Sequence, residues 1–304
     1  HNYHDTYNGL PLAGIVKVPD VNNPATVYWN WYTPSWLCRI LAHLEQGVLF
    51  EKIAGGSSES GGTAYSGWVC NMNDIYDPGT ATYPARDVMR TNISTFVCPS
   101  QGSTGLYPTI AAQPEWSRYR YNYAANFGTY DYNWDGAYAS YPFGDLSWPP
   151  GVSPPEFVYS VQGVPFRLDT GTFMESVTDG LSNTVFCSEI TPATSNPNAT
   201  RYGDTIMSVG AGFTGYFTPN SDGPDINTAC WNVGDVGQGG KALCTGTLAS
   251  GNQLSQRVTV RSFHTGGVNC TMGDGSVHFT SSTVSLHVWR CLTTGAGGES
   301  VSLP

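Results

Sequence analysis

The sequence predicts an α+β fold in which one N-terminal helix packs on an antiparallel β-sheet with long loop insertions. Helical periodicity is clear in one segment near the N-terminus. Beyond residue 56 the chain consists of short apolar runs separated by Gly, Pro, Asn and Asp, which is typical of strands joined by turns. Aromatic residues make up 13% of the chain, which favours a folded, loop-rich protein over a disordered one.

The predicted helix begins near residue 33, because Thr33 can cap it and Pro34 suits its first turn. Apolar residues then recur at spacings of three and four and form one buried stripe: Trp36, Leu37, Ile40, Leu41, Leu44, Val48 and Leu49. Gly55 and Gly56 end the helix. We therefore expect residues 1–56 to form a helical N-terminal part that packs on the core.

Residues 57–260 are predicted to be β-rich. The apolar runs 95–98, 184–190 and 258–263 have the composition of strands. Two loop insertions are expected near 107–165 and 214–251, where periodicity is weak and Tyr, Trp and Pro or Gly are frequent.

The C-terminal segment 261–304 is more regular. Asp274 and Gly275 separate two apolar runs, the second at 276–280, and this dipeptide predicts a hairpin because Gly accepts the positive φ of the turn. A short helix or turn is expected at 285–292. We expect the whole chain, 1–304, to form a single globular domain.

Charge excludes two classes of partner. The net charge is −10 and charged residues make up 12% of the chain, about half the usual share of ~25%. Without runs of Lys and Arg, binding to nucleic acid or to an anionic membrane is not expected. No stretch approaches the ~18 apolar residues of a membrane helix. The chain starts at His1, and we interpret it as a processed, truncated or partly ordered product without direct membrane contact.

The eight cysteines are dispersed, and none forms a C-x-x-C pair: Cys38, Cys70, Cys98, Cys187, Cys230, Cys244, Cys270 and Cys291. An even, dispersed set predicts disulfides in an oxidising compartment. A bridge between Cys230 and Cys244 would close a loop of about 15 residues and stabilise it by ~3 kcal/mol. Buried free thiols are the alternative.

A calcium loop is predicted at residues 131–136. Asp131, Asn133 and Asp135, followed by Gly136, have the alternating spacing that lets oxygen atoms converge on the ion. Asp145 could supply a further ligand, since the twelfth position is Pro142. An ordinary polar turn is the alternative. No other cofactor is expected.

His264 and Asp274 invite a catalytic or metal-binding interpretation, with His278 nearby. We favour a structural one, in which His264 locks a Gly-rich loop by hydrogen bonding and Asp274 shapes the turn at Gly275. A Ser-His-Asp hydrolase is the enzyme alternative, but no G-x-S-x-G elbow is present. The six histidines show no zinc-ligand spacing.

Three sequons have the form of N-glycosylation acceptors, at Asn92, Asn198 and Asn269. Chance yields a few in a chain this rich in Asn, Ser and Thr. The sequence does not decide whether Ser and Thr in the loops carry O-linked sugars.

His264, nine further residues and then Asp274-Gly275 resemble the C-terminal signature of a large bacterial prepilin-like family, domain of unknown function 1559, which is related to the G-type pseudopilins of type II secretion. Other segments resemble the same family in the same order: 1–7, 44–47, 96–100, 123–128, 179–189, 289–292 and 297–299. The match spans nearly the whole chain. Each segment alone is a weak signal, whereas their shared order is specific.

The resemblance implies a pilin-like α+β domain that follows a cleavable leader and a hydrophobic N-terminal helix in the precursor. It implies a non-enzymatic, self-assembling subunit of an extracellular or cell-surface filament, tube or layer, whose partner is itself. G-type pseudopilins carry a structural calcium, although near their C-terminus, so the resemblance also favours calcium binding by this chain. The rival is a carbohydrate- or solute-binding module, with Trp134, Trp148 and Tyr138 as stacking platforms for surface glycans.

Overall fold

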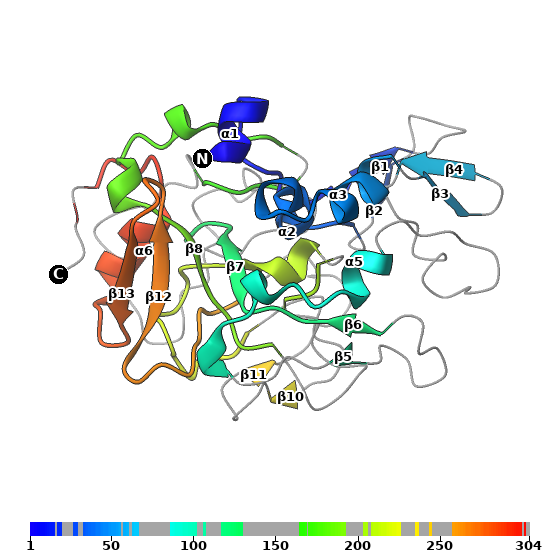
Figure 1. Cartoon of the computed structure of the whole chain (residues 1–304). Helices are drawn as coiled ribbons and strands as arrows, with labels where there is room; N and C mark the ends of the chain where they lie inside the picture. The colour runs from blue at the N-terminus through cyan, green and yellow to red at the C-terminus, as the bar shows by residue number, and fades with distance from the viewer. Residues whose placement is uncertain are drawn as a thin grey trace.

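The computed structural model is shown in Figure 1. It describes residues 1–15, 17–19, 27–29, 33–55, 57–60, 63–66, 86–101, 106–107, 117–129, 164–168, 170–192, 203–205, 208–225, 235–236, 243–244, 257–299 and 301. The calcium loop at 131–136, Asp145 and the proposed stacking residues Trp134, Trp148 and Tyr138 lie outside these residues, as do Cys70, Cys230 and Asn198.

The centre of the molecule is a five-stranded sheet with the order β13-β12-β8-β7-β9. Its strands are β7 (Tyr123–Asn126), β8 (Val185–Glu189), β9 (Gly212–Phe213), β12 (Gly267–Met272) and β13 (Val277–Ser281). Neighbouring strands are antiparallel, except that β9 runs parallel to β7. The mixed α+β class and the mostly antiparallel sheet are therefore confirmed.

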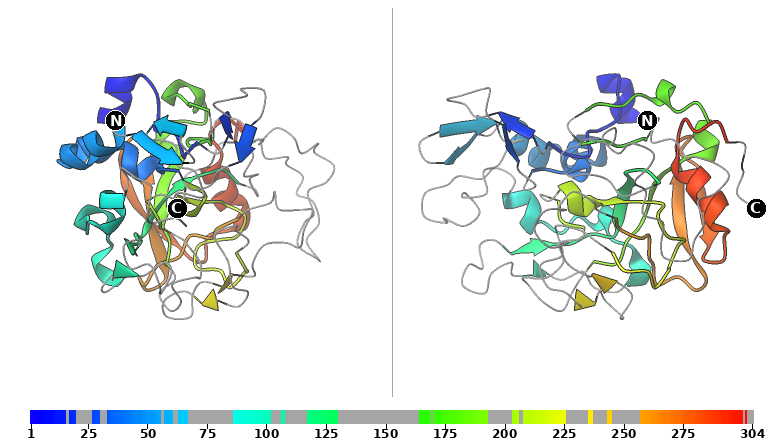
Figure 2. Two further views of the ribbon diagram at one scale, coloured as in Figure 1. Left: turned by 90° about the vertical axis from the view of Figure 1, so that its right-hand side faces the viewer. Right: turned by 180° about the vertical axis from the view of Figure 1, so that it is seen from behind.

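Among the described residues, four two-stranded ladders lie outside the central sheet. They are β1 (Lys17–Pro19) with β2 (Val27–Trp29), β3 (Ser57–Ser60) with β4 (Thr63–Ser66), β5 (Leu106–Tyr107) with β6 (Arg118–Tyr119), and β10 (Asp235–Val236) with β11 (Leu243–Cys244). Figure 2 shows that β3 and β4 extend away from the central sheet, beyond the N-terminal helices.

The prediction of one continuous helix is wrong, because the chain forms three short helical elements instead. These are α2 (Trp36–Arg39), a 3₁₀ turn (Leu41–Leu44) and α3 (Gly47–Ala54). Glu45 adopts a left-handed conformation with φ of 59°, which ends the 3₁₀ turn and redirects the chain before Gly47. Ser35 precedes α2, whereas the hydroxyl of the buried Thr33 accepts a hydrogen bond from the backbone N–H of Ile15.

The other helices are also short: α1 (Asn2–Tyr7), α5 (Arg86–Arg90) and α6 (Leu286–Thr293). Short 3₁₀ turns occur at Ser94–Phe96, Pro99–Gln101, Met174–Ser176, Leu181–Asn183 and Ser208–Ala211. Because the N-terminal helices are this short, the pilin-like form of the prediction is not confirmed. No helix in the described part of the chain has both the length and the apolar character needed to cross a membrane.

The C-terminal predictions are confirmed. The strands β12 and β13 form the expected hairpin, and Gly275 has a φ of 90° at its turn. The helix α6 starts where Ser285 caps it, since the Ser285 hydroxyl accepts a hydrogen bond from Val288 N–H at 3.2 Å. The fully buried Trp289 on α6 stacks on Phe213 of β9, with ring centroids 6.2 Å apart. Figures 1 and 2 show α6 against one face of the β12–β13 hairpin.

Three local predictions need correction. The region 107–165, expected to be loops, contains β7, a strand inside the central sheet. The strand was missed because a polar residue such as Asn126 is not expected in a buried strand. In the structure, the buried Asn126 amide donates hydrogen bonds to the carbonyl groups of Val185 and Thr293. Segment 95–98 contains the end of a 3₁₀ turn rather than a strand, and 258–263 is extended without joining a ladder.

Candidate functional site

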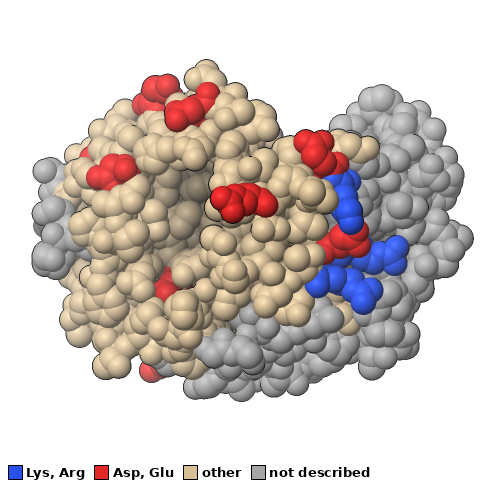
Figure 3. Space-filling view, viewed as in Figure 1, with Lys and Arg blue, Asp and Glu red and all other residues tan. Residues whose placement is uncertain are grey.

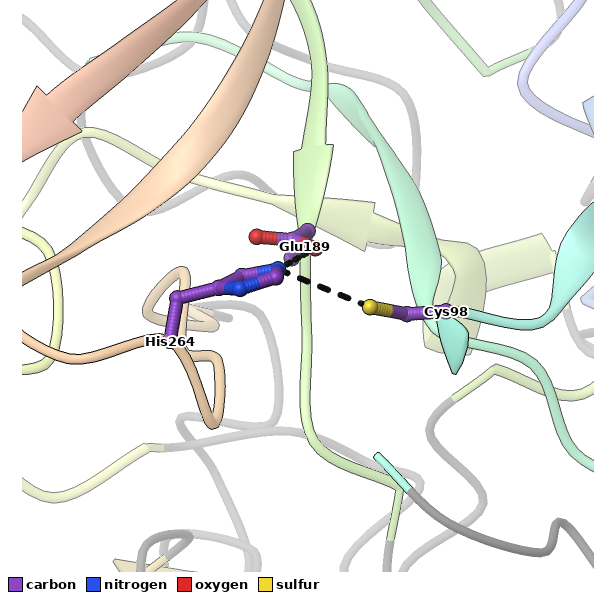
Figure 4. A group of neighbouring side chains, drawn as sticks. All are labelled: Cys98, Glu189 and His264. Carbon is purple, nitrogen blue, oxygen red and sulfur yellow. Dashed lines mark hydrogen bonds and ion pairs between the residues drawn. The ribbon is translucent and has the colours of Figure 1, made fainter. Parts of the chain in front are cut away.

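Three residues far apart in the sequence meet at the end of β8, the middle strand of the sheet, as Figure 4 shows. Cys98 lies between two 3₁₀ turns, Glu189 is the last residue of β8, and His264 lies in the loop that leads into β12. Cys98 and Glu189 are buried, and His264 is partly exposed.

The cluster converges on one atom, the Nε2 nitrogen of His264. Glu189 Oε1 lies 3.0 Å from it, the side-chain nitrogen of Asn269 also lies 3.0 Å from it, and Cys98 Sγ lies 3.6 Å from it. An imidazole nitrogen carries either one hydrogen or one lone pair. It can therefore form one strong hydrogen bond, fewer than the three polar neighbours around it.

Backbone groups hold Glu189 and Cys98 in place. The second carboxylate oxygen of Glu189 accepts a hydrogen bond from the backbone N–H of Asn269 at 2.8 Å, which leaves Oε1 facing His264. The backbone N–H of Cys98 donates to the side-chain oxygen of Asn122 at 3.0 Å. One hydrogen bond therefore fixes the carboxylate of Glu189, and the other fixes the backbone that carries the Cys98 thiol.

The loop that carries His264 is anchored from several sides. Ser262 Oγ accepts a hydrogen bond from His264 N–H at 3.1 Å and donates to the carbonyl of Gly267 at 2.7 Å. Directly before it, Arg261 forms a buried ion pair with Asp225, with Nη1 and Oδ2 2.5 Å apart. These contacts fix the loop through Ser262 and Arg261, and the predicted role of the His264 side chain in locking it stays a prediction.

The electrostatics keep the Cys98 thiol protonated. Burial raises the pKa of Cys98, and the neighbouring Glu189 raises it further. A Cys-His-acid relay needs one imidazole nitrogen for the sulfur and the other for the acid, whereas here Nε2 faces both. The Cys98 N–H is also engaged by Asn122, so it is not available as an oxyanion-hole donor. The geometry does not form such a relay.

The same geometry brings together three ligand types for a metal ion. One sulfur, one imidazole nitrogen and one carboxylate oxygen lie within 4.8 Å of one another. A cleft of about 320 Å³ reaches His264 from the solvent side and is lined by Asn220, Asp222, Arg261, Phe263, His264, Thr265, Gly266 and Ser282.

Asp274 does not belong to this site. It lies beyond the other end of β12, where its Oδ1 accepts hydrogen bonds from the N–H and hydroxyl of Ser276, at 2.9 and 2.7 Å. These bonds lower the pKa of its exposed carboxyl group. The structure therefore separates His264 from Asp274, and Asp274 shapes the turn with Gly275, as the structural interpretation expected.

The disulfide prediction is wrong for the five cysteines whose thiols the structure describes, all of which are free: Cys38, Cys98, Cys187, Cys270 and Cys291. The sheet explains one such case. Cys187 pairs with Thr271, whereas Cys270 pairs with Ser188, so the two thiols point to opposite faces although their strands are neighbours. Cys270 instead lies 3.4 Å from the Ser188 hydroxyl.

Two of the three sequon asparagines lie in the described residues. Asn92 is exposed at the end of α5. Asn269 is partly buried, and its side-chain amide contacts His264.

Sequence reasoning did not connect Cys98 or Glu189 with His264. Spacing rules for metal ligands fail here because each residue comes from a different segment. A signal was nevertheless present: segments 96–100 and 179–189 and the motif that starts at His264 were all among those that resemble one family. Folding brings one residue from each of these three segments into contact.

Comparison with known proteins agrees with that resemblance. A family model named SBP_bac_10, described as a protein of unknown function (DUF1559), matches residues 1–287. No curated protein and no solved structure matches the chain significantly. Since the family model covers nearly the whole chain, the protein belongs to the DUF1559 family.

Proposed function

We propose that this protein is a self-associating structural subunit of an extracellular bacterial filament, tube or surface layer. The observation that carries the proposal is the edge strand β13, which exposes apolar side chains beside an edge that no other described strand pairs with. The extracellular location and the pilin-type assembly rest on the resemblance to prepilin-like proteins and on the low charge of the chain.

The strand β13 is the outermost strand of the central sheet. Val277 is 65% exposed and Phe279 is 54% exposed, and both point to the same face because side chains alternate along a strand. Thr280, on the opposite face, is buried. Soluble proteins commonly protect an edge strand with Lys, Pro or a bulge, and β13 has none of these over Val277–Ser281. A second copy of the chain would cover this surface.

Basic charge does not oppose contact between copies at this hairpin. Figure 3 shows the Lys and Arg side chains gathered near α3 and α5, with none over the β12–β13 hairpin in this view. Lys52, Arg86 and Arg90 line a cleft there, together with Asp87. The face of the hairpin shown there therefore has no basic side chain that a contact with a second copy would have to desolvate.

An open polymer needs two different contact surfaces, because a contact of β13 with itself would close a dimer. A second exposed aromatic surface lies near α1, where Tyr7 is 50% exposed and Phe173 is 49% exposed. The Phe173 ring lies next to Gly9, two residues after Tyr7. We assign the second contact to this Tyr7–Phe173 surface.

The test is sedimentation velocity together with negative-stain microscopy over rising protein concentration. Wild type should form growing oligomers or filaments, and Val277→Lys should remain monomeric because a charge on the edge strand opposes burial. Val48→Lys is the matched control, since Val48 is 76% exposed on α3 and belongs to neither surface, and this variant should assemble like wild type. A wild type that stays monomeric at every concentration would refute the proposal.

Mixing two variants tests whether the contact is head-to-tail. Val277→Lys and Phe173→Lys should each fail to polymerise alone. Together they should form heterodimers, because each retains the surface that the other has lost. If Phe173→Lys polymerises like wild type, the second contact lies elsewhere on the molecule.

A further inference from the structure

We propose that Cys98, Glu189 and His264 bind one divalent transition-metal ion of the zinc class. The site adjoins the assembly surface on β13, because the rings of His264 and Phe279 lie edge to face with their centroids 6.4 Å apart. It would connect three distant segments of the chain through a single ion.

The distances between the ligand atoms suit such an ion. A tetrahedral zinc ion with Zn–S near ~2.3 Å and Zn–N near ~2.0 Å holds the sulfur and the nitrogen about 3.6 Å apart. The separation of Cys98 Sγ and His264 Nε2 is 3.6 Å. For nitrogen and a carboxylate oxygen the same geometry gives roughly 3.3 Å, and Glu189 Oε1 lies 3.0 Å from Nε2. For this pair, a shift of a few tenths of an ångström would reach the tetrahedral separation.

The surplus of polar neighbours around His264 supports a cation. If Nε2 carries a hydrogen and donates it to Glu189, neither the Cys98 thiol nor the Asn269 amide can donate to the same atom. If Nε2 is a bare lone pair, it faces a carboxylate oxygen that repels it. An ion between the three ligand atoms satisfies the lone pair, the carboxylate and the sulfur together.

The charge balance suits a half-buried position. Binding replaces the hydrogen of the Cys98 thiol with the metal, so that one proton is released to solvent and no electron is transferred. The thiolate and the Glu189 carboxylate then contribute two negative charges against the two positive charges of the ion, with a neutral His264. A neutral centre avoids most of the desolvation cost that a lone buried charge would carry.

The surrounding residues already orient the ligands, as is common around metal centres. The backbone of Asn269 fixes Glu189, Asn122 fixes the backbone of Cys98, and Ser262 fixes the backbone of His264. The soft sulfur ligand favours zinc-class ions over calcium or magnesium, which prefer oxygen ligands.

Cobalt(II) titration of the chelator-treated, reduced protein tests the site, with the non-assembling Val277→Lys chain used throughout so that assembly does not interfere. One equivalent should bind and produce a thiolate-to-cobalt charge-transfer absorption, which stoichiometric zinc removes by displacement. Cys98→Ser in the same chain should lose that absorption. Cys187→Ser is the matched control, since Cys187 precedes Glu189 by two residues on the same strand, and it should retain the absorption.

A second measurement needs no change at the site. X-ray absorption at the zinc edge of the loaded protein should show one sulfur ligand with nitrogen and oxygen ligands. A coordination shell without sulfur, or no stoichiometric binding of cobalt or zinc, would overturn the proposal. So would an absorption that persists in Cys98→Ser and disappears in Cys187→Ser.

Discussion

The two ends of β12 carry the two halves of one sequence motif and differ in almost every physical respect. At the His264 end, side chains from three distant segments meet in a partly buried cluster. At the Asp274 end, an exposed carboxylate accepts hydrogen bonds from Ser276, two positions along the chain, in its own hairpin. Six strand residues at about 3.4 Å each separate these ends by roughly 20 Å.

The difference teaches that a fixed sequence spacing need not mean a shared site. The nine residues between His264 and Asp274 form the end of a loop, the whole of β12 and the start of a turn. The His264 end joins remote parts of the fold, and the Asp274 end shapes a local turn. Substitutions should therefore cost more at the first end than at the second, and by different mechanisms.

The largest effect is expected from Asp225→Asn, which leaves the buried Arg261 guanidinium without its charge partner. Breaking a buried ion pair costs about 3–5 kcal/mol of unfolding free energy. Urea denaturation measures it, and Asp222→Asn is the control because Asp222 is exposed and should change stability by less than ~0.5 kcal/mol. Equal stability of the two variants would show that this pair does not anchor the His264 loop.

A smaller loss is expected from Glu189→Gln. The amide keeps the shape of the side chain but replaces one of the two oxygens that accept from His264 and from the backbone of Asn269. Leaving a buried polar group poorly paired costs about 1–3 kcal/mol. The exposed Glu175→Gln serves as the comparison in the same denaturation assay. If Glu189→Gln loses no more unfolding free energy than Glu175→Gln, the contacts of Glu189 in the cluster do not stabilise the fold.

At the other end, Gly275→Ala should cost about 1–2 kcal/mol, because a φ of 90° places a Cβ in a strained conformation. Gly171→Ala is the matched control, since a Cβ there meets no atom within 4 Å and the backbone is not in the positive-φ region. The same assay should find Gly171→Ala close to wild type. If both variants are neutral, the hairpin turn does not depend on glycine.

The smallest effect on stability near neutral pH is expected from the buried thiols, which take part in neither the His264 cluster nor the Asp274 turn. Burial raises the pKa of Cys38 to about 12 and that of Cys270 to about 11, from 9.0. Above pH 9 the unfolded chain loses these protons first, so stability is full below pH 9 and falls as pH rises toward the folded values. Denaturation at pH 8, 9 and 10 should show this decline, and Cys270→Ala should show a shallower one. A flat profile would contradict the burial of these thiols as neutral groups.

Sequence reasoning succeeded where the signal was local. The Asp274-Gly275 turn, the strand β8 and the short helix that follows Ser285 each depend on neighbouring residues, and each was predicted. It failed where tertiary contacts decide the outcome. Glu45 breaks a helical stripe that periodicity alone would continue, and Asn126 sits in a buried strand because distant carbonyl groups satisfy its amide.

The candidate site shows the same limit. His264 was recognised from its motif, whereas its partners were not, because nothing in the spacing of Cys98 or Glu189 points to it. Their thiol and carboxylate meet only after β8 pairs with β12 and the 94–101 turns pack beside them. A sequence can indicate that segments belong to one family pattern, but contact between them is a property of the folded chain.

The independence of the two ends of β12 can be measured most directly by double-mutant cycles in urea denaturation. Glu189→Gln with His264→Gln should show a coupling energy of at least about 0.5 kcal/mol, because these side chains are in contact. Glu189→Gln with Gly275→Ala should be additive within about 0.5 kcal/mol, because the sites are far apart. Coupling of Glu189 to Gly275 without coupling to His264 would contradict the account.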